Sequence, residues 1–105
     1  MRNMILGGLM LAASASAASA ADIYIDQAHQ HFSKPTLTVN AGDTVYFKNE
    51  DTVTHDIRIT DPDGNTNDRG LQEPGVDIVY TFRTPGVYHV GCGIHPSMQL
   101  IVTVK

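Results

Sequence analysis

Residues 41–51 read AGDTVYFKNED, which is a turn signal, an alternating stretch and a second turn signal in succession. Val45 and Phe47 are apolar, and the residues beside and between them are more polar. A period of two puts successive side chains on opposite faces of a β-strand. The flanking Gly, Asp and Asn residues are typical of turns. This stretch therefore predicts a short strand with one face in a core and the other face toward solvent.

The same pattern recurs along the chain and predicts the fold. Further alternating runs predict strands near residues 23–26, 36–39, 57–59, 76–82, 87–90 and 100–104. A polar stretch rich in Pro, Gly and Asn, residues 61–75, predicts a long connection between two sheets, with a mobile flap or interaction loop as the alternative. No segment carries a helical stripe. About seven to eight short strands predict an all-β fold, a Greek-key β-sandwich.

Length, charge and cysteine content exclude several classes of protein. A chain of 105 residues allows one domain, and 42% hydrophobic with 17% charged residues is too apolar for a disordered chain. Seven Lys and Arg against eleven Asp and Glu leave no basic surface, so we expect no nucleic-acid partner. A single Cys excludes an internal disulfide and any site with two thiolates.

The first twenty residues, 1–20, are predicted to be a signal peptide. Arg2 is followed by an apolar stretch from Met4 to Ala13 and by the small-residue cleavage pattern Ala18-Ser19-Ala20. This apolar stretch is too short to cross a bilayer, so we expect no stable membrane anchor. The mature domain would be residues 21–105, in the periplasm or secreted. Loss of Arg2 leaves six basic and eleven acidic residues, a formal charge of -5.

The residues with metal-binding chemistry lie close together near the C-terminus. Cys92, His95 and Met98 fall within seven residues, and His55 lies far upstream. A thiolate, two imidazoles and a thioether are the ligands of blue-copper electron-transfer sites, whereas zinc does not favour the thioether. Because Cys92 would end one strand and Met98 would open the next, the loop between them would return three donors to one end of the sandwich. His55 would arrive from the start of another strand.

The chain resembles the cupredoxins, which are type 1 blue copper proteins, both in the ligand loop and elsewhere. The resemblance rests on the spacing Cys-x-x-His-Pro-x-Met and on Gly42-Asp43-Thr44-Val45, Asn49-x-Asp51 and Ile101-Val102-Thr103-Val104. The short ligand loop is most similar to that of amicyanin, and the whole pattern is similar to small periplasmic cupredoxins of the amicyanin and pseudoazurin kind. The likeness covers essentially the whole mature chain.

The resemblance implies a function and a role for each ligand. One copper per chain would be held by His55 and His95 as equatorial imidazoles, Cys92 as the thiolate and Met98 as the weak axial ligand. The protein would carry single electrons between Cu(II) and Cu(I) and would not be an enzyme. Redox partner proteins would dock near His95 and Ile94 on a monomer, since brief redox contacts use small, weakly apolar patches.

One residue departs from the family pattern. Many cupredoxins place Asn directly after the first His ligand, whereas this chain has Asp56. A carboxylate facing the copper would lower its reduction potential. Alternation from His55 puts Asp56 on the opposite face of the strand, so we expect a small effect.

The same residues allow other interpretations. A Cys92 nucleophile assisted by His95 lacks an orienting third group. A copper-tolerance or metal-handover protein is the alternative function, and His29 with His31 would then bind a second metal if both lie in one strand. A polar edge or turn before Phe32 is the simpler interpretation of that pair. His89 is an odd number of residues from Cys92, so we expect it to face solvent.

Overall fold

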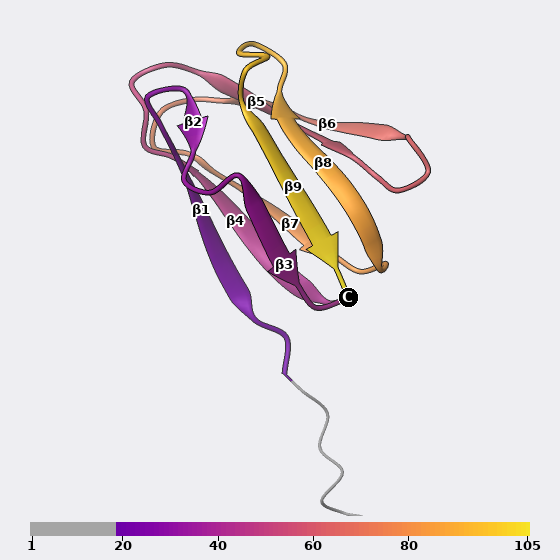
Figure 1. Ribbon diagram of the computed structural model, residues 1–105. Helices are drawn as coiled ribbons and strands as arrows, with labels where there is room; N and C mark the ends of the chain where they lie inside the picture. The colour runs from indigo at the N-terminus through magenta and orange to yellow at the C-terminus, as the bar shows by residue number, and fades with distance from the viewer. Residues whose placement is uncertain (1–18) are drawn as a thin grey trace, which may run out of the picture.

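The protein is an all-β sandwich in the computed structural model, which describes residues 19–105 (Figure 1). The predicted signal peptide, residues 1–20, lies almost entirely outside the described residues. One sheet has four strands in the order β2 (His31–Phe32), β1 (Asp22–Ala28), β4 (Asp43–Asn49) and β7 (Asp77–Phe82). The other has five, in the order β3 (Thr36–Val39), β9 (Gln99–Val104), β8 (Gly86–Cys92), β5 (His55–Thr60) and β6 (Thr66–Gln72).

The chain passes between the two sheets several times, so hydrogen-bonded neighbours are often distant in sequence. β1 pairs with β4, β4 with β7, and β5 with β8, while strands of the other sheet come between them along the chain. The pairs β1–β4 and β3–β9 are parallel and the remaining pairs are antiparallel. The predicted Greek-key β-sandwich is confirmed. Within residues 19–105 no helix has the length and hydropathy needed to span a membrane.

Alternation in the sequence explains which side chains form the core. Along β4 every second residue is buried, and both Val45 and Phe47 are fully enclosed. Phe82 packs edge-on against Tyr80 and Tyr88 at centroid distances of 4.8 and 5.0 Å. Each fully buried aliphatic or aromatic side chain contributes roughly 1.5–3 kcal/mol relative to exposure. The fold is therefore held mainly by the apolar faces of the two sheets.

The prediction of a long connection over residues 61–75 is wrong. Within this range lies β6, which pairs antiparallel with β5 at the edge of the five-stranded sheet. Only Gln72 among its residues is buried, so the apolar alternation that reveals a strand is missing. The short strand β2 was missed as well, because two residues are too few to show a period. These two strands raise the count above the seven to eight expected.

Asp43 anchors the end of the sandwich where β4 begins. Its carboxylate accepts hydrogen bonds from the backbone N–H of Ala21 and of Asn40, each at 2.8 Å. The side chain is enclosed, since the residue is 3% exposed. These two donors, Ala21 first, hold the pKa of Asp43 below its ordinary value of 3.8. The carboxylate thus ties the start of β1 and the turn before β4 together.

Replacing Asp43 tests this anchor. Because the pKa is lower in the folded state, the charged carboxylate stabilises the fold above pH 3.8, and this contribution is lost as the pH falls through the folded-state pKa. We expect Asp43→Asn to lower the free energy of unfolding at neutral pH and to approach wild type in acid, as measured by urea unfolding. Asp77→Asn, which removes a surface ion pair with Lys48, serves as the control. An equal loss at both pH values would contradict the role of the charge.

Candidate metal centre

The pairing of β5 with β8 brings the first two predicted ligands together. In this antiparallel pair Ile57 lies opposite Cys92, so His55 begins β5 just beyond the point where Cys92 ends β8. Cys92 Sγ lies 3.7 Å from His55 Nδ1. His55 is fully buried and Cys92 is 6% exposed. Two donors from distant parts of the chain are thus fixed by backbone hydrogen bonds.

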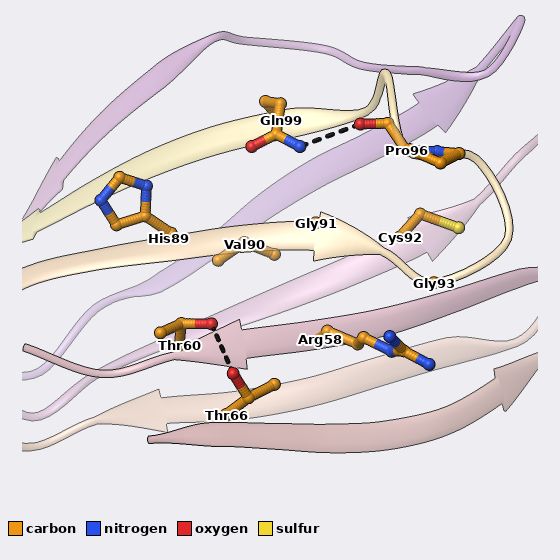
Figure 2. Close-up of a pocket in the computed structure, with 10 residues that line it drawn as sticks. All are labelled: Arg58, Thr60, Thr66, His89, Val90, Gly91, Cys92, Gly93, Pro96 and Gln99. Atoms are coloured by element: carbon orange, nitrogen blue, oxygen red, sulfur yellow. Dashed lines mark hydrogen bonds between the residues drawn. The ribbon is translucent and has the colours of Figure 1, made fainter. Parts of the chain in front are cut away.

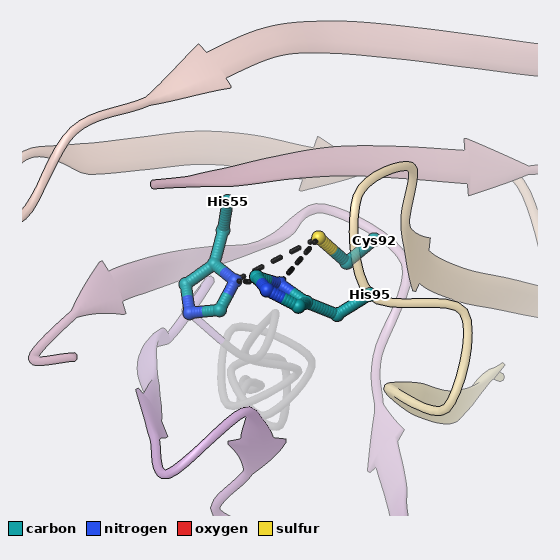
Figure 3. A group of neighbouring side chains, drawn as sticks. All are labelled: His55, Cys92 and His95. Atoms are coloured by element: carbon teal, nitrogen blue, oxygen red, sulfur yellow. Dashed lines mark hydrogen bonds between the residues drawn. The ribbon is translucent and has the colours of Figure 1, made fainter. Parts of the chain in front are cut away.

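The loop between β8 and β9, residues 93–98, returns His95 to the same place (Figure 3). His95 Nδ1 lies 3.8 Å from Cys92 Sγ and 3.1 Å from His55 Nδ1. The N–H of Met98 donates to the carbonyl of His95 at 3.0 Å and closes the loop. We call the three ligand atoms of His55, Cys92 and His95 the donor triangle, since they all lie within 4.8 Å of one another.

Met98, the fourth predicted ligand, directly precedes β9. It is 1% exposed and belongs to the same buried apolar cluster as Cys92. A methionine enclosed in this way offers its soft sulfur inside the protein, shielded from water. The structure thus brings three of the predicted donors into one triangle and buries the fourth.

The dimensions of the donor triangle suit a metal ion. Metal–nitrogen bonds of about 2.0–2.1 Å and metal–sulfur bonds of about 2.3 Å put the donors of a trigonal site roughly 3.5–3.8 Å apart. The two sulfur–nitrogen edges, 3.7 and 3.8 Å, match this spacing, and the nitrogen–nitrogen edge of 3.1 Å is shorter. One thiolate with two imidazoles, and a thioether in the same buried cluster as the thiolate, is the donor set that copper prefers. The residues present therefore fit copper.

Asp51 fixes the orientation of the His55 ring. Its carboxylate oxygen lies 3.2 Å from His55 Nε2 and also accepts the backbone N–H of Gln30 at 2.8 Å. The pKa of Asp51 lies below its ordinary value, and the largest cause is the hydrogen bond from the N–H of Gln30. Because a carboxylate can only accept hydrogen bonds, His55 Nε2 carries the proton. Nδ1, the atom of His55 in the donor triangle, therefore keeps a free lone pair for a metal ion.

The sulfur of Cys92 has a backbone hydrogen-bond donor. The N–H of Asp56 points to Cys92 Sγ at 3.3 Å, and the carbonyl of Asp56 accepts the N–H of Gly93 at 2.9 Å. A hydrogen-bond donor to the sulfur restrains the position of the sulfur. The residue after His55 thus serves the site through its backbone.

The side chain of Asp56 contacts Arg58, with 3.5 Å between the carboxylate oxygen and Nε, and Arg58 also contacts Asp68. The carboxyl is enclosed, with the residue 7% exposed, and burial followed by the nearby Asp68 raises the pKa of Asp56. A Cβ on Gly93 would lie 2.5 Å from the Asp56 carboxylate and 2.6 Å from Arg58 Nε. Glycine at this position therefore lets the ion pair pack against the ligand loop.

An open hollow lies over β5, β8 and β9, beside the ligand loop, residues 93–98 (Figure 2). Its lining includes Arg58, His89, Gly91 and Gln99. Gln99 Nε2 donates to the carbonyl of Pro96 at 3.0 Å, which adds a further restraint on the ligand loop. His89 is exposed and stands apart from the donor triangle, in agreement with alternation along the strand.

His29 and His31 do not share a strand. His29 lies in the turn between β1 and β2, where His29 and Gln30 have positive φ angles of 52° and 58°, and His31 begins β2. Both imidazoles are exposed. The simpler interpretation, a polar turn before Phe32, matches the structure. Within residues 19–105, the cluster of three or more potential ligand groups is His55, Cys92 and His95.

A β-sandwich with one thiolate and two imidazoles at one end defines a class of small metalloproteins, and sequence comparison agrees with it. The family model described as the Cupredoxin-like domain matches residues 3–104. The chain belongs to the cupredoxin family.

Individual relatives show which members of the family this chain resembles. Methylamine utilization protein MauL of Methylophilus methylotrophus is 32% identical over an alignment of 115 residues. The alignment covers 97% of this chain and 66% of that protein. A reduced Cu(I) form of an amicyanin mutant superposes with a TM-score of 0.73 at 26% identity, covering 89% of each chain. A purple cupredoxin from Nitrosopumilus maritimus gives 0.70 at 26% identity, covering 79% of this chain and 99% of that one. The protein is a small cupredoxin of the amicyanin type, and copper is its cofactor.

Sequence reasoning missed the groups that support the ligands. Asp51 is predicted as part of a turn and of the family pattern Asn49-x-Asp51 but not as a partner of His55, although its place four residues before His55 in a loop is a usable signal. The backbone N–H of Asp56 leaves no trace in the sequence, because its bond to sulfur depends on the pairing of β5 with β8.

Removing the Asp51 carboxylate tests its role in orienting His55. Loss of the group that orients a metal-binding imidazole typically weakens metal binding by about 10–100-fold. We expect this loss for Asp51→Ala in a chelator-competition titration with copper. Glu50→Ala, which removes the adjacent exposed carboxylate, should bind like wild type. Equal affinity of the two variants would contradict the orienting role.

Proposed function

We propose that this protein is a periplasmic type 1 copper protein that carries single electrons between redox partners. His55, Cys92 and His95 are the equatorial ligands, and Met98 is the weak axial ligand. The observation that carries this proposal is the donor triangle, whose three atoms lie within 4.8 Å of one another. Bound copper supplies a one-electron change between Cu(II) and Cu(I).

The scaffold restrains the ligands independently of the metal. Asp51 holds the His55 ring, the N–H of Asp56 meets Cys92 Sγ, and the bond from Met98 to His95 closes the loop. Ligands that are already in place need little movement when the charge of the bound ion changes. Such rigidity supports fast electron transfer. We therefore assign a carrier role.

The ligand loop supplies the surface for electron exchange. His95 is partly buried, and the neighbouring Ile94 is 45% exposed. Gly93 and Pro96 are exposed beside them. Together residues 93–96 form a small, weakly apolar surface beside a ligand ring, and weak redox encounters use contact areas of this kind. Partner proteins dock here, and the acidic mature chain favours partners with a basic surface.

The periplasmic location rests on the sequence. The charged start, apolar stretch and small-residue cleavage pattern of residues 1–20 support export, and the mature domain begins near Ala21. In that oxidising compartment a single Cys bound to copper is protected from other thiol chemistry.

The colour of the copper protein tests the ligand set. We expect one Cu(II) per full chain and an intense visible absorption from the bond between Cys92 sulfur and copper, with the matching EPR spectrum. Cys92→Ser should lose this absorption, because the hydroxyl oxygen replaces the soft sulfur ligand. His89→Ala, which removes an exposed imidazole from the same strand, should keep it.

Two results would overturn the ligand assignment: a wild-type protein that stays colourless with Cu(II), or a Cys92→Ser variant that keeps the absorption. The stoichiometry also separates electron transfer from copper handover. A second tight copper that disappears in a His29→Ala, His31→Ala double variant would favour handover.

A charge on the ligand loop tests the docking surface. We expect Ile94→Lys to slow electron exchange with a redox partner while the absorption spectrum stays unchanged, because the lysine enters a small apolar contact without touching a ligand. Val87→Lys is the matched control, since Val87 is 48% exposed at the other end of β8. Equal rates for Ile94→Lys and wild type in stopped-flow measurements would remove this surface from the proposal.

A further inference from the structure

Two glutamine side chains are buried inside the apolar sandwich. Gln27 of β1 and Gln72 of β6 are each 0% exposed. Gln27 Nε2 donates to Gln72 Oε1 at 2.8 Å. Because β1 and β6 belong to different sheets, this hydrogen bond crosses the interior. A buried amide costs free energy unless it is hydrogen-bonded, so the pair calls for a physical explanation.

The two amides belong to a larger network with Asn49 at the end of β4. Gln72 Nε2 donates to the carbonyls of Phe47 and Val76. Asn49 Nδ2 donates to the carbonyl of Gln72 at 2.9 Å and to the carbonyl of Val53 at 3.0 Å. We call Gln27, Gln72 and Asn49 the amide network. It joins strands of both sheets to the loop between β4 and β5, residues 50–54.

That loop leads directly to the metal centre. The N–H of Asp51 donates to Asn49 Oδ1 at 2.9 Å, and the N–H of Glu50 donates to the carbonyl of Gln27 at 2.9 Å. Asp51 in turn contacts His55 Nε2. In the pairing of β5 with β6, His55 lies opposite Gln72. The network therefore holds the loop before His55 and the strand beside it.

We propose that Gln27, Gln72 and Asn49 are positioning residues that fix loop 50–54 and, through Asp51, orient His55 toward the donor triangle. This inference rests on the proposed function, since it gives His55 the role of a metal ligand. The network ties the loop before His55 to both sheets. Gln27 Oε1 has no hydrogen-bond partner among the described residues.

The experiment compares the full chain with a Gln27→Leu, Gln72→Met double variant. Its matched control is Thr44→Val, Thr81→Val, which removes a 2.8 Å hydroxyl pair between β4 and β7 at the end of β4 away from Asn49. The first readout is amide hydrogen exchange of the metal-free protein. The second is the EPR spectrum of the Cu(II) form.

In the double variant we expect the amides of Glu50 and Asp51 to exchange about fivefold faster, the change that the net contribution of one hydrogen bond predicts. The amides of β8 and β9 should accelerate less than those of Glu50 and Asp51. The urea midpoint should fall, because the carbonyls of Phe47 and Val76 lose the donor Gln72 Nε2. The Cu(II) EPR lines should broaden as His55 takes up several orientations. The control should change neither readout.

Unchanged exchange at Glu50 and Asp51, or an equal acceleration in all strands, would overturn the positioning role. If the double variant does not fold, the single variant Gln27→Met replaces it, because this variant keeps the bonds of Gln72 to Phe47 and Val76. Unchanged exchange of the Glu50 and Asp51 amides in Gln27→Met also overturns the proposal. A colourless wild type would overturn the proposed copper function, whereas a coloured wild type with an unaffected double variant would overturn the positioning role alone.

Discussion

The register between β5 and β8 is the constraint on which the metal centre depends. With Ile57 opposite Cys92, His55 and the sulfur come to the same end of the sheet, where their ligand atoms lie 3.7 Å apart. A slip by one residue would turn every side chain of β5 to the other face and would remove His55 from the site. The buried faces of Ile57 and Ile59 resist such a slip, because it would expose both to water. Core packing and ligand placement are therefore enforced by the same register.

Three polar groups of the metal centre have partners that also restrain their positions. His55 is held by Asp51, Asp51 by the N–H of Gln30, and Cys92 Sγ by the N–H of Asp56. Most buried polar groups in native proteins are satisfied by such partners, and here the partners come from three segments of the chain: the β1–β2 turn, loop 50–54 and β5. The short hairpin between β1 and β2, with its left-handed turn at His29 and Gln30, thereby contributes to the metal centre although neither side chain is a ligand.

The sequence predicted the parts that have local patterns. Val45 and Phe47 reveal β4 by their alternation, and Cys92, His95 and Met98 reveal the ligand loop by their spacing. β6 could not be found, because an edge strand exposed on both faces has no apolar alternation. Gln27 and Gln72 are 45 residues apart, and as polar residues they look like surface positions until the two sheets bring them together. Contacts that depend on topology rather than on neighbouring residues could not be predicted from the sequence.

The composition of β6 limits unwanted association. A free strand edge offers unpaired N–H and C=O groups to any other chain, and it is a common starting point for aggregation. β6 carries Asp68, Arg69 and Gly70 where a sticky edge would carry aliphatic residues, and the register of its partner β5 shifts between Asp56 and Arg58. Arg69 also reaches across to the ring of Tyr80 in the other sheet, 5.5 Å away. Charge, irregular pairing and this contact therefore discourage extension of the sheet by another chain.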